Sequence, residues 1–575
     1  MTTERAACTA LLLTLALFGG ACGDDDGATG DAGPAVDAGP ADAGEPPFTV
    51  DSYCPGAEGC PAGGDPTLLV GAAMREITPS LEGRDRMTLD TNGDGIWDPF
   101  DGDEFEDVDE DGLFDPVFIA GFGSPRPASD IHDPQWARAI VLQQGETTMA
   151  LVALDTFSIF IDDTDAIRAM VGDEVDFLTT CATHTHQGAD TLGIYGLGES
   201  SSGAELSYLQ HVREQAAAAV REALEELRPA HVQYASFRFR DQPGGTTRYV
   251  SDARHPRIID DEARIARFLD AEDESTIATF VNFGAHAEYW GDENTNLSSD
   301  FPHFLRDATE NGVAGPDGEE VPGVGGMTAF CQGAIGSQIG PGEITPETWE
   351  GEALPDESRE TMEVVGRQMG YFVLQALGED GGSVTDETAE LGFRQRRFFV
   401  DVQNRGFHVA ILNDLFLRES YGWDEDQLLR PGVNEPDILT EVAVVDIGRL
   451  QMIWVPGEID PALFVGGYDG TSYTPEDVDF IDDDLENPPD IALAPEGPYL
   501  RDLAREDAEY VGIVSLGSDQ IGYFLPDFDY VLDARNPYID EAPGDHYEET
   551  VSVGIDGWGR VQRQLEQLLA WTPDE

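Results

Sequence analysis

A buried apolar strand that runs out into a polar loop, at residues 177–190, constrains the fold of this chain more than any other stretch. Residues two apart in an extended backbone project to the same face, so His184 and His186 in this loop can point into one pocket. A His-x-His pair at the end of a strand is a common way to present imidazoles to a divalent metal ion. The alternative is a pair of hydrogen-bonded loop histidines, because two ligands alone do not make a metal site.

The composition excludes some classes of partner. The 575 residues suffice for one large domain or for two to three ordinary ones, and 41% hydrophobic residues can form a packed core. Lys and Arg number 32 against 113 Asp and Glu, which gives a formal net charge of −81. This charge would repel nucleic acid and anionic membrane surfaces, and it favours bound cations.

Strand and helix patterns alternate along most of the chain. Apolar strands are predicted at residues 139–142, 149–154 and 276–283, with a strand pair at 442–455 that turns at Gly448. Helices are predicted at residues 204–227, 359–377 and 558–571. No clean boundary divides these elements, so we expect a single mixed α/β domain over residues 67–575, with a β-sheet core and flanking helices.

The first 22 residues have the composition of a signal peptide. Arg5 precedes a short apolar run, and small residues lead up to Cys22, as in a bacterial lipobox. Cys22 would then be lipidated; Gly19 stands where an aliphatic residue is usual, and plain secretion is the alternative. We therefore expect an exported protein, either a periplasmic or outer-membrane lipoprotein or a secreted one.

Residues 23–66 are predicted to be a disordered tether, because Asp, Ala, Gly and Pro recur there without periodic apolar residues. Near its end, Cys54 and Cys60 bracket a short turn that suits a local disulfide in an exported protein, the alternative being two free thiols. Cys181 and Cys331 each lie at the end of a predicted strand, and the sequence leaves their pairing open.

An acidic insert at residues 88–116 carries two copies of a calcium-loop pattern, with oxygen ligands at positions 1, 3 and 5 and Gly at position 6. A carboxylate at position 9 replaces the usual bidentate Glu at position 12. The predicted calcium ligands are Asp90, Asn92, Asp94 and Asp98 in the first copy and Asp107, Asp109, Asp111 and Asp115 in the second. The alternative is a solvated acidic loop; if calcium binds, we expect its role to be structural.

Further candidate metal ligands lie at the ends of other apolar strands. His286 follows the strand at residues 276–283, and Glu458 follows an apolar strand and a Pro-Gly pair. Two histidines and a carboxylate suit a catalytic zinc ion, which keeps one position for water. Each segment alone has a simpler interpretation, namely a hydrogen-bonded histidine or a turn carboxylate.

Taken in order, these segments resemble the neutral/alkaline non-lysosomal ceramidase family over residues 68–553. The matching motifs are Val-Gly-Ala-Ala-Met-Arg-Glu-Ile-Thr-Pro (70–79), Ala-Thr-His-Thr-His (182–186), the strand before His286, Ser-Ser-Asp (298–300), Val-Pro-Gly-Glu (455–458) and His-Tyr-Glu (546–548). The resemblance implies a zinc site formed by His184, His286, Glu458 and Tyr523. It also implies that His186 is an acid/base or oxyanion-stabilising group, that Arg248 is the active-site arginine and that Tyr547 contacts substrate.

The activity implied by the resemblance is hydrolysis of a linear amide by a metal-activated water, as at the N-acyl bond of ceramide-like sphingolipids. The implied partner is a small-molecule or lipid amide; nucleic acid is not expected, and membrane contact would occur only through the N-terminal lipid anchor or a lipid substrate. The alternatives are another amide or ester hydrolase on the same fold, or a non-catalytic surface protein that binds calcium and zinc.

Two departures from the family pattern bear on mechanism and substrate. Ceramidases bring a serine to the metal on a Gly-Asp-[Val/Leu]-Ser-Pro-like loop, whereas here Ile339 stands at that position and Ser337 lies two residues early. A serine mechanism is therefore not expected. Ceramidases also continue into a C-terminal β-sandwich domain, which we do not expect here because the sequence ends soon after Tyr547. The acidic insert is not a usual ceramidase feature either.

Overall fold

The computed structural model describes residues 48–573, except 109, 124, 198–200, 341, 343, 345, 431, 471–477 and 483. The predicted signal peptide, the predicted lipidation site Cys22, residues 23–47 of the predicted tether and the predicted calcium ligand Asp109 lie outside the described residues. Among the helices that are described, none has the length and apolar character needed to cross a membrane.

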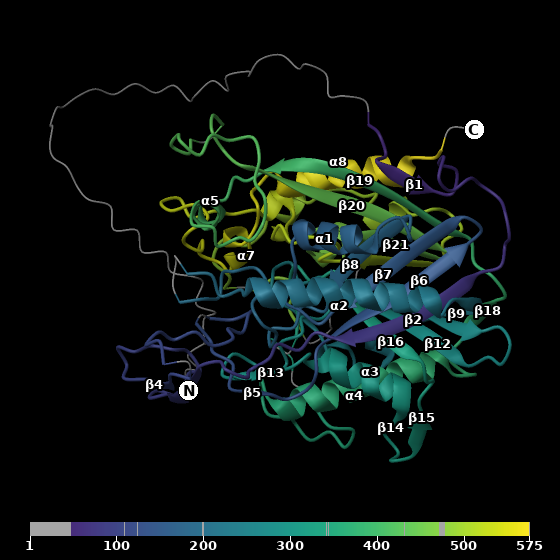
Figure 1. Cartoon of the computed structure of the whole chain (residues 1–575), viewed down its shortest axis with the longest axis horizontal. Coiled ribbons are helices and arrows are strands. Elements are labelled where there is room, and N and C mark those ends of the chain that lie inside the picture. The colour runs from purple at the N-terminus through teal and green to yellow at the C-terminus, as the bar shows by residue number, and fades with distance from the viewer. Residues whose placement is uncertain are drawn as a thin grey trace.

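The larger of two main sheets has nine strands (Figure 1). Its path runs β16 (Met327–Gln332), β12 (Thr276–Phe283), β11 (Glu262–Asp270), β9 (Arg228–Arg238), β2 (Leu69–Glu76), β6 (Trp136–Gln144), β7 (Thr147–Leu154) and β8 (Phe177–Ala182), with β18 (Val384–Asp386) beside β9. The pairs at the two ends of this path, β12 with β16 and β7 with β8, are parallel, and the pairs between them are antiparallel.

The second main sheet has five strands. Its order is β1 (Ser52–Cys54), β19 (Leu391–Asp401), β20 (Asp437–Ile447), β21 (Leu450–Trp454) and β23 (Tyr510–Val514). The strand pair predicted at residues 442–455 is confirmed, because β20 and β21 are antiparallel neighbours joined through Gly448. Gly448 has φ 54°, a left-handed conformation that favours glycine at this turn.

The two sheets pack face to face, and helices cover their outer faces. Along β7, Met149 and Leu151 face the second sheet and pack with Met452 and Trp454, whereas Ala150 and Val152 face the helices. This burial on both sides explains why the strands read as continuous apolar runs. Helices α1 (Ile161–Val171), α2 (Leu206–Glu225), α3 (Phe301–Asn311) and α4 (Arg359–Leu377) cover the nine-stranded sheet, and α8 (Gly557–Ala570) covers the five-stranded one (Figure 1).

These layers confirm the predicted mixed α/β architecture with a sheet core and flanking helices. The remaining elements are short. They are β3 (Arg86–Leu89), β4 (Glu104–Glu106), β5 (Asp130–Ile131), β10 (Ser251–Asp252), β13 (Asn296–Leu297), β14 (Gly312–Ala314), β15 (Glu320–Pro322), β17 (Gln338–Ile339), β22 (Glu458–Ile459), β24 (Tyr523–Phe524), α5 (Arg405–Leu412), α6 (Pro461–Val465) and α7 (Tyr547–Thr550).

The predicted tether is too long at its C-terminal end. Residues 52–54 form β1, which pairs with β19 at the edge of the five-stranded sheet. Tyr53 packs on Trp571 with ring centroids 4.7 Å apart, and the buried Cys54 forms a disulfide with Cys60. The sequence did not predict this strand, because three residues are too few to show a periodic pattern.

A second disulfide joins the two strands at opposite ends of the nine-stranded path. Cys181 in β8 and Cys331 in β16 have Cα atoms 5.8 Å apart, so the sheet bends until its outermost strands meet at their carboxyl ends. Gln332, the next residue in β16, donates hydrogen bonds to the carbonyl groups of Thr183 (2.9 Å) and Ala285 (2.5 Å). The segments that lead to His184 and His286 are therefore held side by side.

Candidate metal centre

Three strand ends converge on a buried cluster of His184, His286 and Glu458. His184 lies two residues beyond β8, His286 lies three residues beyond β12, and Glu458 begins the short strand β22 that follows β21. The side chains of His184, His286 and Glu458 are 1%, 2% and 2% exposed. His184 has φ 61°, so its backbone is left-handed and not extended as the sequence argument assumed. Non-glycine residues occupy this region at a cost, and such outliers gather at functional sites.

The spacing within this cluster fits a tetrahedral metal ion. Glu458 Oε2 lies 3.4 Å from His184 Nε2 and 3.2 Å from His286 Nε2. Ligand atoms about 2.0–2.1 Å from a tetrahedral zinc ion lie roughly 3.3 Å from one another. Both distances from Glu458 Oε2 therefore match an edge of a zinc coordination tetrahedron.

The hydrogen bonds around the cluster leave these same atoms free. His184 Nδ1 lies 2.8 Å from the Phe157 carbonyl oxygen, and His286 Nδ1 lies 3.3 Å from the Gln338 carbonyl oxygen. A carbonyl can only accept, so each Nδ1 carries the proton and each Nε2 presents a lone pair. Gln520 donates to Glu458 Oε1 at 2.6 Å, whereas the buried Glu458 Oε2 has no hydrogen-bond partner among the described residues. Outer hydrogen bonds of this kind orient metal ligands.

The charge of Glu458 is buried and needs a cationic partner. Burial alone would raise the pKa of Glu458, whereas protonated His184 and His286 would hold the pKa of this carboxyl group well below its usual range; when both Nε2 atoms carry lone pairs, a bound cation would take their place. A buried carboxylate with an unpartnered oxygen is costly unless a cation compensates it. The donor set therefore fits a divalent cation of the zinc class, held by His184, His286 and Glu458.

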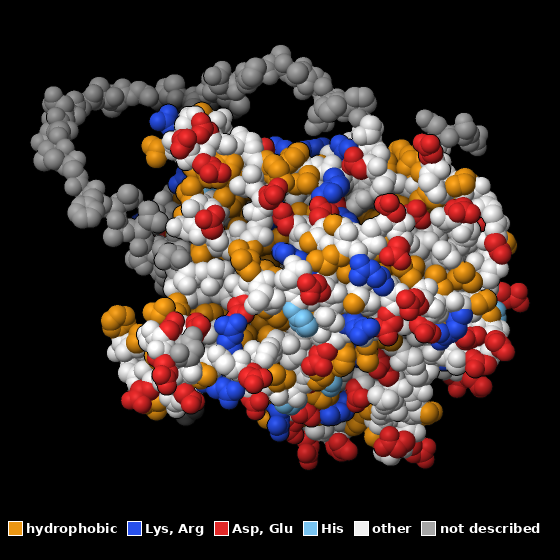
Figure 2. Space-filling view, viewed as in Figure 1, with side chains coloured by type: hydrophobic (Ala, Val, Ile, Leu, Met, Phe, Trp, Pro, Cys, Tyr) orange, Lys and Arg blue, Asp and Glu red, His pale blue; other side chains and the backbone are white. Residues whose placement is uncertain are grey.

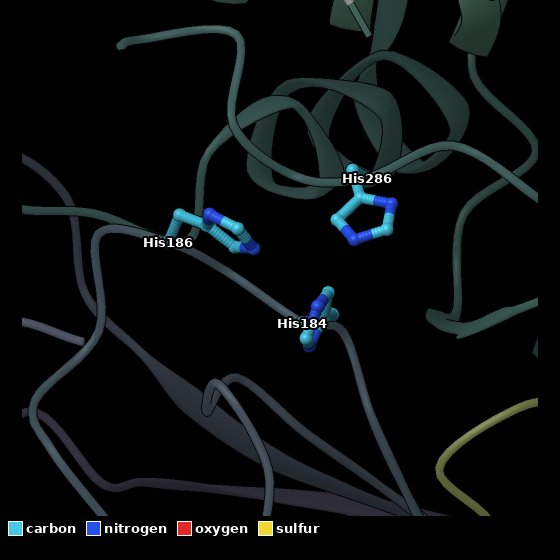
Figure 3. A group of neighbouring side chains, drawn as sticks. All are labelled: His184, His186 and His286. Atoms are coloured by element: carbon cyan, nitrogen blue, oxygen red, sulfur yellow. The ribbon is translucent and has the colours of Figure 1, made fainter. Parts of the chain in front are cut away.

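His186 lies beside this cluster in a different environment (Figure 3). Its ring centroid is 4.9 Å from that of His184 and 5.4 Å from that of His286, and ligand atoms of the three histidines all lie within 4.8 Å of one another. Neither ring nitrogen of His186 has a hydrogen-bond partner in the described part of the chain. Burial and the two neighbouring histidines lower the pKa of His186 well below its usual value. By position, His186 can serve as a ligand or as an acid/base group.

Two tyrosines lie next to Glu458. Strand β24 pairs in parallel with β22, which places Tyr523 directly opposite Glu458. Tyr547, at the start of α7, has its ring centroid 5.8 Å from that of Tyr523. Burial, reinforced by the Glu458 charge, raises the pKa of Tyr523 well above its usual value, so its hydroxyl stays protonated and can donate a hydrogen bond. The structure thus brings both predicted tyrosines to the site.

Arg248 is placed differently from the other predicted site residues. It ends a short 3-10 turn, Thr246–Arg248, and its guanidinium forms an ion pair with Glu347. Among the described contacts, none joins Arg248 to the three histidines or to Glu458. A different arginine reaches the site: the buried guanidinium of Arg126 donates to the carbonyl groups of His186 and Ala120.

The loop that carries a serine in ceramidases reaches the centre here through its backbone. Ile339 pairs with Ser251 in the two-stranded β10–β17 ladder, and the preceding residue, Gln338, supplies the carbonyl that orients His286. Ser337 is buried beside the carboxyl groups of Asp252 and Asp460. This segment can orient a metal ligand without providing a serine at the position of Ile339.

The predicted Ser-Ser-Asp motif supports the loop that carries the histidines. Thr185 donates to the Ser298 carbonyl at 2.8 Å. Asp300 caps α3 and accepts hydrogen bonds from the backbone N–H groups of Tyr289 (3.2 Å) and Trp290 (3.1 Å). The motif therefore connects the segment after β8 to the segment after β12.

The acidic insert forms a separate lobe at the lower left of Figure 1, where β4 is labelled, and Figure 2 shows acidic side chains on its surface. Asp90 accepts hydrogen bonds from the backbone N–H groups of Gly93 and Gly95, at 2.6 and 2.9 Å. In the described part of the insert, which leaves out Asp109, no three carboxylates place ligand atoms within 4.8 Å of one another. Trp97, Phe105 and Phe114 pack together beneath these loops, with ring centroids 4.3–5.5 Å apart.

Sequence reasoning missed Glu288, whose Oε2 lies 3.2 Å from His186 Nδ1. The signal was present, because Glu288 follows His286 at the same two-residue spacing that links His184 and His186. Gln520 and Arg126 were also missed. Their roles depend on tertiary contacts with Glu458 Oε1 and with the His186 carbonyl, which no local pattern reports.

Comparisons with known proteins support the same architecture. No protein-family model matches the sequence, and no curated protein is a significant sequence match. Among solved structures, the neutral ceramidase from Pseudomonas aeruginosa aligns with a TM-score of 0.56 and 15% identity over 88% of this chain and 74% of that one. A structure described as a ceramidase complexed with C2 aligns with a TM-score of 0.57 and 15% identity over 88% of this chain and 75% of that one. The chain therefore has the fold of the neutral ceramidases.

Proposed function

We propose that this protein is a zinc-dependent amide hydrolase whose substrate class is the N-acyl bond of ceramide-like lipids. The observation that carries the proposal concerns the buried Glu458 Oε2, which has no hydrogen-bond partner among the described residues and lies 3.2 and 3.4 Å from two histidine Nε2 atoms. The shared fold with neutral ceramidases supports the reaction class.

His184, His286 and Glu458 would hold the ion, with Tyr523 next to them. Bound zinc lowers the pKa of a coordinated water and polarises the carbonyl group of the substrate. His186 lies on the more exposed side of the cluster, where its side chain is 8% exposed, so it can accept the proton of the attacking water and pass it to the departing amine. The hydroxyl groups of Tyr523 and Tyr547 would donate hydrogen bonds to the oxyanion as it forms.

A lipid amide is favoured over other substrates by the fold comparison alone, in which one of the aligned ceramidases is described as complexed with C2. A different amide or an ester remains the second candidate, because one fold hosts several substrates and position 339 is Ile here. The third candidate is a surface protein that binds metal without turnover.

Export and calcium binding belong to the same proposal. The disulfides Cys54–Cys60 and Cys181–Cys331 support an oxidising compartment, as expected for a secreted or lipidated protein. The two D-x-[DN]-x-D-G repeats support structural calcium in the acidic insert. Calcium would offset the mutual repulsion of the insert carboxylates.

Zinc content and hydrolysis, measured together, test the proposal. The purified protein is expected to hold one zinc ion per chain and to release fatty acid from a fluorescent ceramide. Glu458→Ala should lose the zinc and lower turnover by roughly 100-fold or more, because an anionic ligand is removed. Glu496→Ala, which removes an exposed glutamate, is the matched control and should change neither quantity.

Each alternative gives its own outcome in this experiment. Zinc with turnover of short N-acyl amides or esters, but not of ceramide, would keep the site and replace the substrate. A protein that holds no zinc, and in which His286→Ala changes nothing, would contradict the proposal as a whole. Circular dichroism and thermal melting of each variant separate loss of the site from loss of the fold.

A further inference from the structure

Glu288 lies at the edge of the candidate metal centre and is not one of the proposed metal ligands. Its Oε2 lies 3.2 Å from His186 Nδ1, and its side chain is 15% exposed. Within the described part of the chain, His186 is the one His, Lys or Arg side chain that lies within 4 Å of the Glu288 carboxylate. Of the four charged groups that act on it most, three are carboxylates, Glu357, Asp300 and Glu458, and the fourth is His286. A largely buried carboxylate among mostly like charges needs a specific reason to be there.

The backbone places Glu288 against His186 through a short parallel ladder. Thr185 and Ala287 form an isolated parallel bridge, and the His186 N–H donates to the Ala287 carbonyl at 2.9 Å. The residues that flank this bridge meet in pairs. On one side the rings of His184 and His286 are 4.7 Å apart, and on the other side His186 meets Glu288.

The histidines of the two pairs differ in the groups that lie next to their ring nitrogens. Backbone carbonyls lie against Nδ1 of His184 and of His286, so both rings are held as neutral donors of an Nε2 lone pair. Neither nitrogen of His186 makes a hydrogen bond to a described residue, and the Glu288 carboxylate lies within ion-pair distance of Nδ1, at 3.2 Å. Hydrogen bonds between site residues are often poorly aligned without substrate and tighten in the complex. A hydrogen bond from Nδ1 to a carboxylate sets the tautomer and the ring orientation of a histidine that transfers protons.

Solvent exposure also separates the His186–Glu288 pair from the proposed metal ligands. The His184, His286 and Glu458 side chains are at most 2% exposed, whereas those of His186 and Glu288 are 8% and 15% exposed. A substrate entering from solvent would therefore meet the His186–Glu288 pair before it meets the ligands.

We propose that Glu288 is a positioning residue that accepts a hydrogen bond from His186 Nδ1 when substrate is bound and so leaves Nε2 facing the scissile amide. This inference rests on the proposed hydrolase function. In the reaction, a water oxygen bonds to the carbonyl carbon while His186 Nε2 takes the water proton. The C–N bond then breaks, and the same proton passes to the amine nitrogen, so the imidazole returns to its starting state. Glu288 keeps its contact with Nδ1 throughout and exchanges no atom with substrate.

A double-mutant cycle between Glu288 and His186 tests this role. Glu288→Gln keeps the size of the side chain and removes its charge. We expect it to lower kcat by roughly 10- to 100-fold, with KM within about threefold of wild type, because orienting partners of site histidines have effects of this size. Zinc content and melting temperature should stay at wild-type values. Glu288→Asp should fall in between, since its shorter side chain weakens the contact with Nδ1.

The cycle then asks whether Glu288 acts through His186. The double variant Glu288→Gln/His186→Ala should be no slower than His186→Ala alone. The matched control is Glu357→Gln, which removes a neighbouring carboxylate charge without touching His186 and should leave kcat within about twofold of wild type.

Several results would overturn the role of Glu288. Additive losses in the double variant would show that Glu288 does not act through His186. A fall in zinc content in Glu288→Gln would make His186 a metal ligand that Glu288 orients. A Glu288→Gln variant with wild-type kcat would overturn this role while the hydrolase proposal stands. A wild-type protein without zinc or without hydrolysis would overturn both.

Discussion

The buried histidine centre and the acidic insert gather potential metal ligands in opposite ways. In the centre, His184, His286 and Glu458 come from strand ends far apart in the chain and meet where the side chains are at most 2% exposed. In the insert, the carboxylates follow one another within residues 88–116, and most are partly or fully exposed. The insert is therefore visible in the sequence as one contiguous motif, whereas the ligands of the histidine centre lie in separate segments.

The difference lies in how each region satisfies its charges. Asp90 in the insert accepts hydrogen bonds from backbone N–H groups of its own loop, so water and local hydrogen bonds offset part of its charge even before an ion binds. Glu458 has one buried oxygen without a hydrogen-bond partner among the described residues, and an uncompensated charge costs far more in the interior than at the surface. A dense run of carboxylates is therefore weaker evidence for a resident ion than a single buried orphan atom. We expect a change in one region to leave the other unaffected. Removal of a disulfide, removal of calcium and substitution of loop glycines test this expectation.

The largest effect should follow removal of the disulfide beneath the histidine centre. Cys181→Ala/Cys331→Ala opens a link across 150 residues and should lower the free energy of unfolding by up to about 5 kcal/mol, since long loops gain most from closure. Because Cys181 lies three residues before His184, zinc affinity should fall as well. Denaturant unfolding and titration against a competing chelator measure the two effects.

The second disulfide is the matched control. Cys54→Ala/Cys60→Ala opens a link across only 6 residues, at the edge of the five-stranded sheet, and should cost at most about 2 kcal/mol. Its zinc affinity should equal that of the wild type. Equal losses of zinc affinity in both double variants would show that the disulfide near the site only stabilises the fold.

Removal of calcium should have an intermediate effect that is confined to the insert. After EGTA treatment and readdition of zinc, new proteolytic cuts are expected within residues 88–116, because the insert carboxylates then repel one another. Turnover should be unchanged, since the described part of the insert contributes no ligand to the histidine centre. An identical cleavage pattern with and without calcium would contradict the calcium loops, and a loss of turnover would contradict the independence of the two regions.

The smallest effect compares the glycines at position 6 of the two acidic loops. Gly95 has φ 73° and Gly112 has φ 81°, so alanine at either position should cost about 1 kcal/mol of backbone strain. A Cβ at Gly95 would also lie 3.2 Å from the Glu293 carbonyl oxygen, whereas at Gly112 nothing lies within 4 Å. Gly95→Ala should therefore raise the rate of proteolysis of the insert more than Gly112→Ala. Equal rates would show that the contact with Glu293 does not constrain the insert.

Much of the fold was predictable because its elements are locally encoded. Strand β12 and helix α4 have the predicted bounds, 276–283 and 359–377, since apolar periodicity is a property of adjacent residues. The strand β1 was missed, because three residues pair with a distant strand and carry no periodic pattern. The family resemblance pointed to the histidines, Glu458 and both tyrosines, which the structure brings together. It also pointed to Arg248, whose guanidinium pairs with Glu347.

The sequence by itself determined which side chains stand at the ends of buried strands, because the alternation and length of apolar runs are local. Only the tertiary structure decided which of these ends meet. The bending of the nine-stranded sheet, which brings Cys181 to Cys331, sets His184 beside His286, and the Thr185–Ala287 bridge sets His186 beside Glu288. Contacts between residues 100 or more positions apart depend on the packing of whole layers, and no local pattern reports that packing.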